Sequence, residues 1–207
     1  MKIITISREF GSGGREIGKQ LADQLGFDYY DKEIITAIAD KHDMDKNYVS
    51  EILDNKRWQT IPLTFCCSFT MVNIMQSIKV DLLVEQTQVI KEIAKAGKNC
   101  VIVGRNADEL LKNYHPFNIF ICADMKSKIR RCIERTTKNE NLSRKEMEEK
   151  IRSIDKNRAE VREIITHKSW GLHTSYHLIV NASNWNLKEL TSAIAVFTES
   201  WFRRLKQ

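Results

Sequence analysis

The sequence lacks the features that mark secreted, metal-binding and membrane proteins. It has five cysteines, an odd number, and no C-x-x-C pair, which argues against a disulfide framework and a zinc site. Its longest uncharged stretch, residues 58–78, is interrupted by Gln, Thr, Ser, Asn and Pro and is too polar to span a membrane. No basic and apolar leader precedes the first strand-like residues, so we expect a cytoplasmic protein without a membrane partner.

Repeats, low-complexity tracts and proline are also scarce, since the chain has only two prolines. With 207 residues, 42% of them apolar and 29% charged, it has the composition of a single globular domain, with or without a small insertion. The formal net charge of +6 indicates an anionic partner, which leaves nucleotides, nucleic acid and lipid headgroups open. His173 and His177 are four residues apart, but no third ligand clusters with them, and we interpret both as structural.

Short β-rich runs alternate with helical patterns along the chain. Apolar runs predict strands at residues 2–7, 27–30, 99–104, 117–123 and 176–182. Apolar periodicity predicts helices at residues 15–25, 32–41, 73–96, 125–136, 144–167 and 187–206. Gly26 and Gly97 are typical helix stops, and Ser143 with Glu146 forms a capping box. This order predicts an α/β fold of three layers, with a central parallel sheet of about five strands flanked by helices.

Residues 43–78 do not follow this alternation. A short helix over residues 45–53 leads into the uncharged run, which contains Trp58, Phe65 and Phe69. We interpret the region as an insertion near the carboxyl ends of the strands, where open α/β sheets bind their ligands. The alternative, which we weigh equally, is that the run buries a homodimer interface.

A glycine-rich turn follows the first predicted strand and opens the first predicted helix. Gly11, Ser12, Gly13 and Gly14 allow backbone N–H groups to approach a phosphate, and a helix N-terminus adds positive potential. Aligned with the P-loop motif G-x-x-x-x-G-K-[ST], the first glycine falls at Arg8, the lysine at Gly14 and the hydroxyl residue at Arg15. The match is therefore partial, and a glycine turn that only allows tight strand–helix packing is the alternative.

Three stretches together carry a resemblance to a known family. They are "ITISREFGSGGREIGKQLADQLGFDYYDKEII", "VIVGRNADELL" and "SIDKNRAE", in that order. The chain resembles the cytidylate kinase-like family of the P-loop nucleoside monophosphate kinase group over nearly its whole length. The resemblance implies a P-loop fold with a nucleoside monophosphate-binding insertion at residues 43–78 and a small lid at residues 128–145. It also implies phosphoryl transfer from ATP, with Mg²⁺, to a nucleoside monophosphate such as CMP or dCMP.

The phosphate loop departs from the kinase pattern. Gly14 stands where the kinases have a lysine, and Arg15 is our candidate replacement because a guanidinium can bridge phosphate oxygens. Glu16 follows, and no Ser or Thr comes after the lysine position to help hold Mg²⁺; Ser12 could do so only with a different geometry. Farther on, "YYDKEI" keeps the aspartate of the kinases as Asp31, whereas their phosphate-binding arginine falls at Ala37.

The other motifs supply arginines. "VIVGRN" places Arg105 at a strand end, where it either holds a substrate phosphate or caps the sheet edge. On the helix 144–167, Arg158 lies in an apolar stripe, and Asp155, one turn earlier, is either its structural partner or a substrate contact. For Lys126, Lys128 and Lys138 we expect a solvated basic face.

The resemblance distributes the candidate site residues over three roles. The catalytic candidates are Arg15, Arg105, Arg131 and Arg158. The ATP-binding candidates are Gly11, Ser12, Gly13, Gly14, Arg15, Glu16, Arg130 and Arg135. The candidates for binding the acceptor are Asp31, Lys32, Arg105, Asn106, Asp108, Arg152, Asp155 and Arg158, and no residue is assigned as a metal ligand. A nucleotide-binding regulatory module that has lost kinase chemistry is the alternative function, and nucleic-acid binding is disfavoured because no motif supports it.

Overall fold

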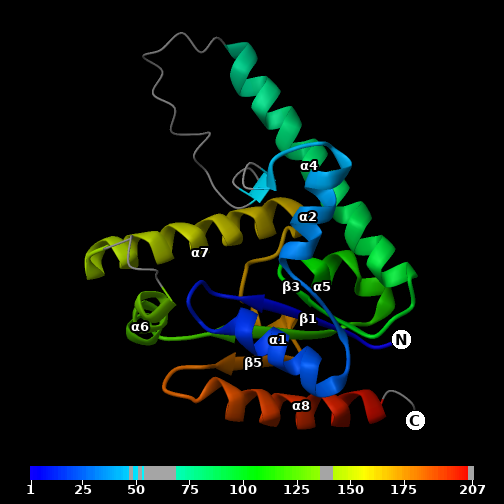
Figure 1. Ribbon diagram of the computed structural model, residues 1–207, viewed down its shortest axis with the longest axis vertical. Coiled ribbons are helices and arrows are strands. Elements are labelled where there is room, and N and C mark those ends of the chain that lie inside the picture. Colours follow the sequence, from blue (N-terminus) through cyan, green and yellow to red (C-terminus); the bar gives the residue numbers. More distant parts are fainter. Residues whose placement is uncertain (47–48, 51–52, 54–68, 136–141, 205–207) are drawn as a thin grey trace.

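The structure is a computed structural model of the chain, and it describes residues 1–46, 49–50, 53, 69–135 and 142–204. Its centre is one five-stranded sheet (Figure 1). The strands are β1 (Ile3–Arg8), β2 (Asp28–Tyr30), β3 (Cys100–Val103), β4 (Phe117–Cys122) and β5 (Leu178–Asn181). All neighbouring strands are parallel, in the order β2-β3-β1-β4-β5. The predicted α/β fold class is therefore confirmed.

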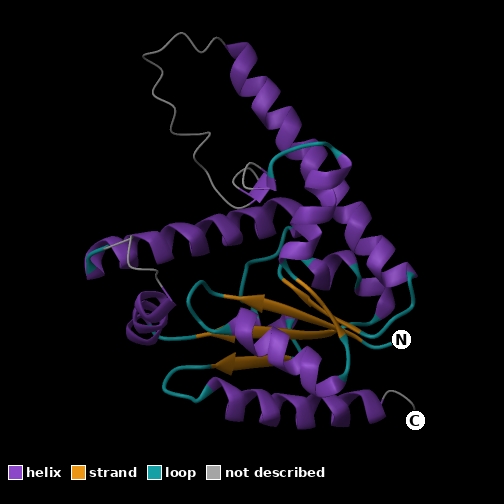
Figure 2. Cartoon of the chain, viewed as in Figure 1, coloured by secondary structure: helices purple, strands orange, loops and turns teal. Residues whose placement is uncertain are grey.

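Helices cover both faces of the sheet (Figure 2). On one face α1 (Gly14–Leu25) and α8 (Leu187–Arg204) pack over a core that includes Ile4, Ile6 and Val103. On the other face α2 (Lys32–Lys41), α4 (Phe69–Lys95) and α5 (Ala107–Leu110) enclose a core that includes Ile3 and Ile102. Successive side chains of a strand point to opposite faces, so β1 and β3 contribute residues to both cores.

The remaining helices lie at the carboxyl ends of the strands. There α6 (Met125–Arg135) packs against α7 (Arg144–Thr166) through Ile129, Met147 and Ile151 (Figure 1). Two short 3₁₀ helices, Lys112–Tyr114 and His173–Ser175, complete the described elements. Parallel strands end at one edge of a sheet. The β1–α1 loop, the end of β3 and the helices α6 and α7 therefore face a common region.

The signals at the helix ends are confirmed. Gly26 and Gly97 adopt left-handed φ values of 65° and 74° where helices stop. Ser143 accepts a hydrogen bond from the Glu146 backbone N–H, and the Glu146 carboxylate accepts one in return, which completes the capping box. Helix α4 begins at Phe69, earlier than the apolar periodicity predicted.

Most of the segment that breaks the alternation cannot be compared with its prediction. Residues 47–48, 51–52 and 54–68 lie outside the described part of the chain, as do residues 136–141 of the predicted lid. The roles of the insertion and the lid, and the dimer alternative, therefore stay predictions. None of the described helices combines the length and the hydrophobicity that a bilayer-spanning helix needs.

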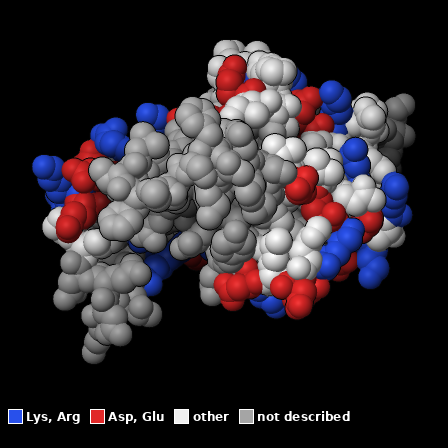
Figure 3. Space-filling model, turned by 90° about the horizontal axis from the view of Figure 1, so that it is seen from above, with Lys and Arg blue, Asp and Glu red and all other residues white. Residues whose placement is uncertain are grey.

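Charges of both signs mix on the molecular surface. Figure 3 shows acidic and basic side chains interspersed over the coloured part of the face seen from above. Nucleic acid binding is favoured by an extended basic surface. The described residues of this face do not form one.

The cysteines and histidines are placed by packing. Cys100 is buried in the core as expected, whereas Cys122 is only half-buried, and Cys66 and Cys67 lie outside the described residues. His177 stacks on Phe117 with ring centroids 5.7 Å apart. No group of three His, Cys, Asp or Glu side chains in the described part of the chain is arranged to hold a metal ion.

His177 should make the fold sensitive to mild acid, although much of its side chain is exposed. Burial lowers the pKa of His177, and its Nδ1 accepts a hydrogen bond of 2.9 Å from the Asn118 N–H, which requires the neutral ring. The unfolded chain therefore binds a proton at higher pH than the folded protein does. We expect the free energy of unfolding to fall as the pH drops below about 6.5. Urea titrations at pH 7.5 and 5.5 should show this fall, and His177→Asn should reduce it; an equal fall in the variant would contradict the assignment.

Candidate active site

The glycine loop is held in place by hydrogen bonds of its own and from other elements. Gly11 and Gly13 adopt positive φ values of 75° and 90°. The Ser12 hydroxyl donates to the Glu9 carbonyl at 2.8 Å, and the Gly14 N–H approaches the Ser12 Oγ at 3.4 Å. Arg131, which is buried on α6, donates to the Ser12 carbonyl at 3.1 Å. Such a preformed loop at the N-terminus of a twelve-residue helix presents N–H groups to an anion.

Packing also requires glycine in this loop. A Cβ at Gly11 would lie 2.9 Å from the Cys132 sulfur and 3.0 Å from the Lys128 carbonyl oxygen. The structure thus supports the packing role that the sequence left open, and this role does not exclude the binding of an anion by the same loop.

A buried ionic cluster supports the loop from behind. The Lys128 ammonium lies 2.7 Å from the Glu9 carboxylate and 3.0 Å from that of Asp155, with only 7% of the Lys128 side chain exposed. The Asp155 carboxylate also accepts a 2.6 Å hydrogen bond from the Phe10 N–H. Burial raises the pKa of Asp155, while the Phe10 and Lys128 contacts favour its ionised form. The expectation that Lys128 belongs to a solvated basic face is therefore wrong, because two carboxylates from other elements enclose it.

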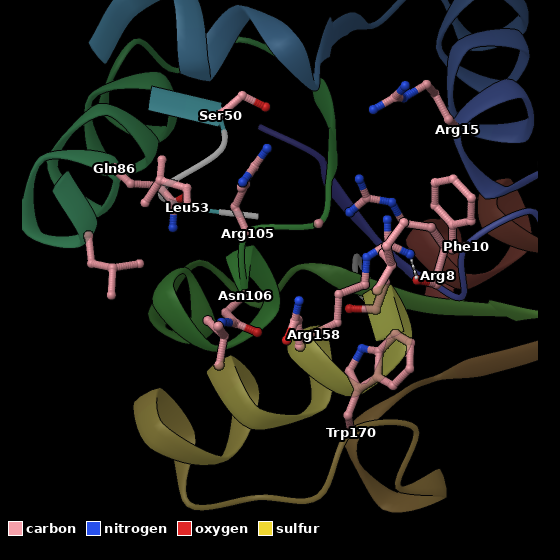
Figure 4. A pocket seen from close by; sticks show the side chains of 16 residues that line it. Arg8, Phe10, Arg15, Ser50, Leu53, Gln86, Arg105, Asn106, Arg158 and Trp170 are labelled. Carbon is pink, nitrogen blue, oxygen red and sulfur yellow. Dashed lines mark hydrogen bonds between the residues drawn. The ribbon is translucent and has the colours of Figure 1, made fainter. Parts of the chain in front are cut away.

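Two adjoining pockets lie at this edge of the sheet. The loop pocket is lined by Gly11, Gly13 and Gly14 and also by Arg131, Arg135 and Lys150. The strand-end pocket is lined by Ser50, Gln86, Arg105, Asn106, Asn157 and Trp170 (Figure 4). Both pockets are also lined by Arg8, Phe10, Arg15 and Arg158. The two pockets are thus neighbours that share arginine side chains.

The shared arginines come from three elements. Arg8 ends β1, Arg15 stands in the first turn of α1 and Arg158 lies on α7 (Figure 4). Asp31 forms ion pairs with Arg15 and, at 3.5 Å, with Arg8, and its side chain is only 3% exposed. Arg158 donates to the Arg8 carbonyl at 2.9 Å and lies 3.5 Å from Asp155. Phosphate groups are bound by such convergent guanidinium groups.

The electrostatics of Arg8 favour an anion in this place. Burial and then the charge of Arg158 lower the pKa of Arg8 to about 9, although Asp31 opposes the change. Arg105 and Arg15 act in the same direction as Arg158. An arginine stays charged near neutral pH. The lowered pKa therefore means that burial and the neighbouring arginines disfavour this charge, and an anion placed among these arginines would stabilise it.

The turn after β3 brings Arg105 and Asn106 to the strand-end pocket. Gly104, Arg105 and Asn106 all have positive φ values, 79°, 60° and 53°. Left-handed conformations are uncommon for residues other than glycine and concentrate at functional sites. The turn directs the Arg105 side chain into the pocket between Ser50 and Arg8 (Figure 4).

Several predicted site residues lie away from the two pockets. Asp108 is buried and pairs with Arg162. The Arg162 Nη1 lies 2.7 and 2.6 Å from the two carboxylate oxygens of Asp108. Arg152 is exposed and pairs with Glu148, and Arg130 is exposed. Glu16 pairs with Arg135 beside a shallow hollow that Lys32 also lines. Asp31 and Asp155 do not line either pocket but hold residues that do.

Sequence reasoning missed some lining residues. Arg8 was noted only as the residue at the first glycine of the P-loop motif, and Phe10, Lys150, Asn157 and Trp170 were not singled out. An arginine in place of that glycine was the available signal for Arg8. For the others the sequence offers no signal, because their role depends on how α7 and the loop after it meet the β1–α1 loop.

The described residues do not form a magnesium site of their own. Mg²⁺ in kinases is usually bound by one or two carboxylates together with substrate phosphates. Here the carboxylates near the loop are engaged by cations: Glu9 by Lys128, Asp31 by Arg8 and Arg15, and Glu16 by Arg135. The Ser12 hydroxyl is fully buried and donates to the loop's own backbone.

Comparisons with known proteins agree with this geometry. The model of the cytidylate kinase-like family matches residues 3–184. Among curated proteins, none matches the chain. A solved structure of an uncharacterized protein from Eubacterium ventriosum is 24% identical with a TM-score of 0.70, covering 97% of this chain and 99% of that one.

Two solved kinases share the fold at lower identity. A shikimate kinase from Bacteroides thetaiotaomicron has a TM-score of 0.58 at 16% identity and covers 96% of this chain and 98% of its own. A deoxyadenosine kinase from M. mycoides has a TM-score of 0.52 at 16% identity, and the match covers 97% of this chain and 100% of the kinase. Family and fold together support a kinase that acts on a nucleotide or another small molecule.

Proposed function

The chain belongs to the cytidylate kinase-like family, and we propose that it transfers the γ-phosphoryl group of ATP to a nucleoside monophosphate, with CMP or dCMP as the acceptor. The observation that carries this proposal is the junction of the two pockets. A phosphoryl transfer needs a donor and an acceptor phosphate side by side, with positive charge between them. The loop pocket and the strand-end pocket adjoin, and the side chains they share include Arg8, Arg15 and Arg158.

In this proposal the loop pocket binds the phosphates of ATP. The N–H groups of Gly11 to Gly14 and the N-terminus of α1 face the β- and γ-phosphates, and Arg135 and Lys150 add positive charge to the lining. Arg131 holds the loop through the Ser12 carbonyl. The loop is thus preorganised before the nucleotide arrives.

The strand-end pocket then binds the acceptor. Arg105 and Arg158 neutralise its phosphate, and Asn106, Gln86 and Asn157 offer amide groups for a base or sugar. Asp31 and Asp155 act as positioning residues, since each holds an arginine that lines the pocket. An acceptor phosphate oxygen attacks the γ-phosphorus, and the bond from this phosphorus to the β–γ bridging oxygen breaks, so that ADP leaves.

An acceptor screen tests this function. The protein is incubated with ATP and Mg²⁺ together with each of the common ribo- and deoxyribonucleoside monophosphates, and the products are separated by chromatography. We expect one acceptor, CMP or dCMP, to yield its diphosphate together with an equal amount of ADP. If every acceptor is recovered unchanged while ATP still raises the melting temperature, the chain is a nucleotide-binding module instead.

A further inference from the structure

We propose that Arg8 takes the place of the missing P-loop lysine, so that the departures from the motif at positions 8 and 14 form one compensated exchange. A standard loop has glycine at the position of Arg8 and lysine at that of Gly14, and this chain reverses the two. The lysine of a standard loop reaches the β- and γ-phosphates of the bound nucleotide. This inference rests on the proposed binding of a nucleotide triphosphate in the loop pocket.

The packing of Arg8 on Gly14 is the first observation. A Cβ at Gly14 would lie 2.5 Å from the Arg8 Cβ, 3.0 Å from its Cγ and 3.3 Å from the Ile121 Cβ. Cβ atoms do not approach other carbon atoms so closely without a shift of one of them. The stem of Arg8 therefore occupies the space in which a lysine side chain at position 14 would begin.

The course of the Arg8 side chain is the second observation. A Cβ at Gly104 would overlap the Arg8 guanidinium, so the side chain runs from the first turn of α1 to the turn that follows β3. It is 12% exposed, and it lines both the loop pocket and the strand-end pocket. Its charge thus lies at the junction across which a phosphoryl group would pass.

The surroundings of Arg8 hold it in this position. Asp31 lies 3.5 Å from its Nη2, and Arg158 is hydrogen-bonded to its carbonyl oxygen. The nearby charges of Arg158, Arg105 and Arg15 disfavour its own charge, and Asp31 offsets them in part. A phosphate bound between these arginines would neutralise the positive charge that Asp31 leaves unbalanced.

Arg15, the replacement favoured by the sequence, is placed differently. Its side chain is 52% exposed and pairs through Nε with Asp31. It also faces the outer hollow beside Glu16 and Lys32. Arg15 is therefore at the solvent edge of the site, whereas Arg8 is at its centre.

A four-protein cycle tests the exchange. The wild type, R8G, G14K and the double variant R8G/G14K, which restores the glycine and the lysine of the motif, are compared by ATP titration and thermal unfolding. R8G should weaken ATP binding about 10- to 100-fold, as expected for the loss of a charged hydrogen-bonding group. G14K should also weaken binding, and it should lower the melting temperature because its Cβ collides with Arg8. The double variant should regain most of both losses; a double variant worse than either single one would overturn the proposal.

A second pair of variants separates charge from folding. Arg8→Met keeps an unbranched stem, and Arg15→Met, which removes a charge from the first turn of α1, is the matched comparison. We expect Arg8→Met to melt at or above the wild-type temperature without nucleotide, since it removes a cation from a cluster of like charges, yet to bind ATP at least 10-fold more weakly than Arg15→Met. Arg8→Met that binds ATP like the wild type would overturn the proposal, and a larger loss in Arg15→Met would give the lysine's role to Arg15.

These readouts do not need an acceptor. If the wild type binds ATP through Arg8 but yields no diphosphate, the kinase function fails and this inference stands. If the wild type forms a diphosphate while Arg8→Met binds ATP unchanged, the inference fails and the kinase function stands. A wild type that does not bind ATP overturns both.

Discussion

Replacing Arg158 with methionine should lower the rate of phosphoryl transfer about 10³-fold, the lower end of what an arginine that stabilises the transferring group contributes. Arg158 lines both pockets, and its Nη1 donates to the Arg8 carbonyl at 2.9 Å. Its removal would take away positive charge where the transferred group carries most negative charge. It would also release the carbonyl that ends β1. The measurement is kcat with ATP and the acceptor found in the screen.

The same helix provides a control for this variant. Lys156 is an exposed cation on α7 that lines neither pocket, so Lys156→Met removes one positive charge without touching the site. Its kcat should equal that of the wild type. Both variants should melt within a few degrees of the wild type. A tenfold or smaller loss of kcat in Arg158→Met would remove Arg158 from the catalytic group.

Removing either partner of the Asp108–Arg162 pair should cost about 3–5 kcal/mol in the free energy of unfolding, as is typical when a buried ion pair loses one partner. Only 1% of the Arg162 side chain and 3% of the Asp108 side chain are exposed. Arg162→Met leaves a carboxylate without its cation, and water cannot replace the cation at this depth. Urea denaturation of the wild type, Arg162→Met and Asp108→Asn provides the measurement.

A double variant separates the buried charge from packing. In Asp108→Asn/Arg162→Met both charges are gone, so we expect it to be more stable than Arg162→Met alone. Because the pair joins α7 to the short helix α5, directly after the turn of Arg105 and Asn106, Arg162→Met should also raise KM for the acceptor. Single variants that lose less than about 1 kcal/mol would indicate that water reaches the pair.

Much of the fold could be predicted because it follows from local patterns. The apolar runs at Ile3–Arg8 and Phe117–Cys122 favour buried strands, since β-branched and aromatic residues pack well on a sheet. The capping box at Ser143 and the left-handed glycine Gly26 mark helix ends through contacts within one turn. The place of the glycine loop between β1 and α1 was predictable for the same reason.

Assigning roles to single charged residues required the tertiary structure. Lys128 looks like a surface lysine in the sequence, yet it is buried between Glu9 and Asp155, which come from other elements. Asp108 looks like part of the Arg105 motif, yet it pairs with Arg162, 54 residues away. Helical spacing shows which residues share a face but not which distant charge meets that face.

The sequence by itself thus determined the order of the elements, the sheet, the family and the location of a glycine loop that lacks the lysine of the P-loop motif. Only the tertiary structure decided which arginine fills the lysine's space. Arg8 and Gly14 are six residues apart, and no periodicity relates the end of a strand to the first turn of the next helix. Their packing depends on the path of the loop. Hydrogen bonds that join the loop to Arg131 of α6 and Asp155 of α7 fix this path. A side chain's chemistry is set by its residue type, whereas its partners are set by contacts that form only when the chain closes on itself.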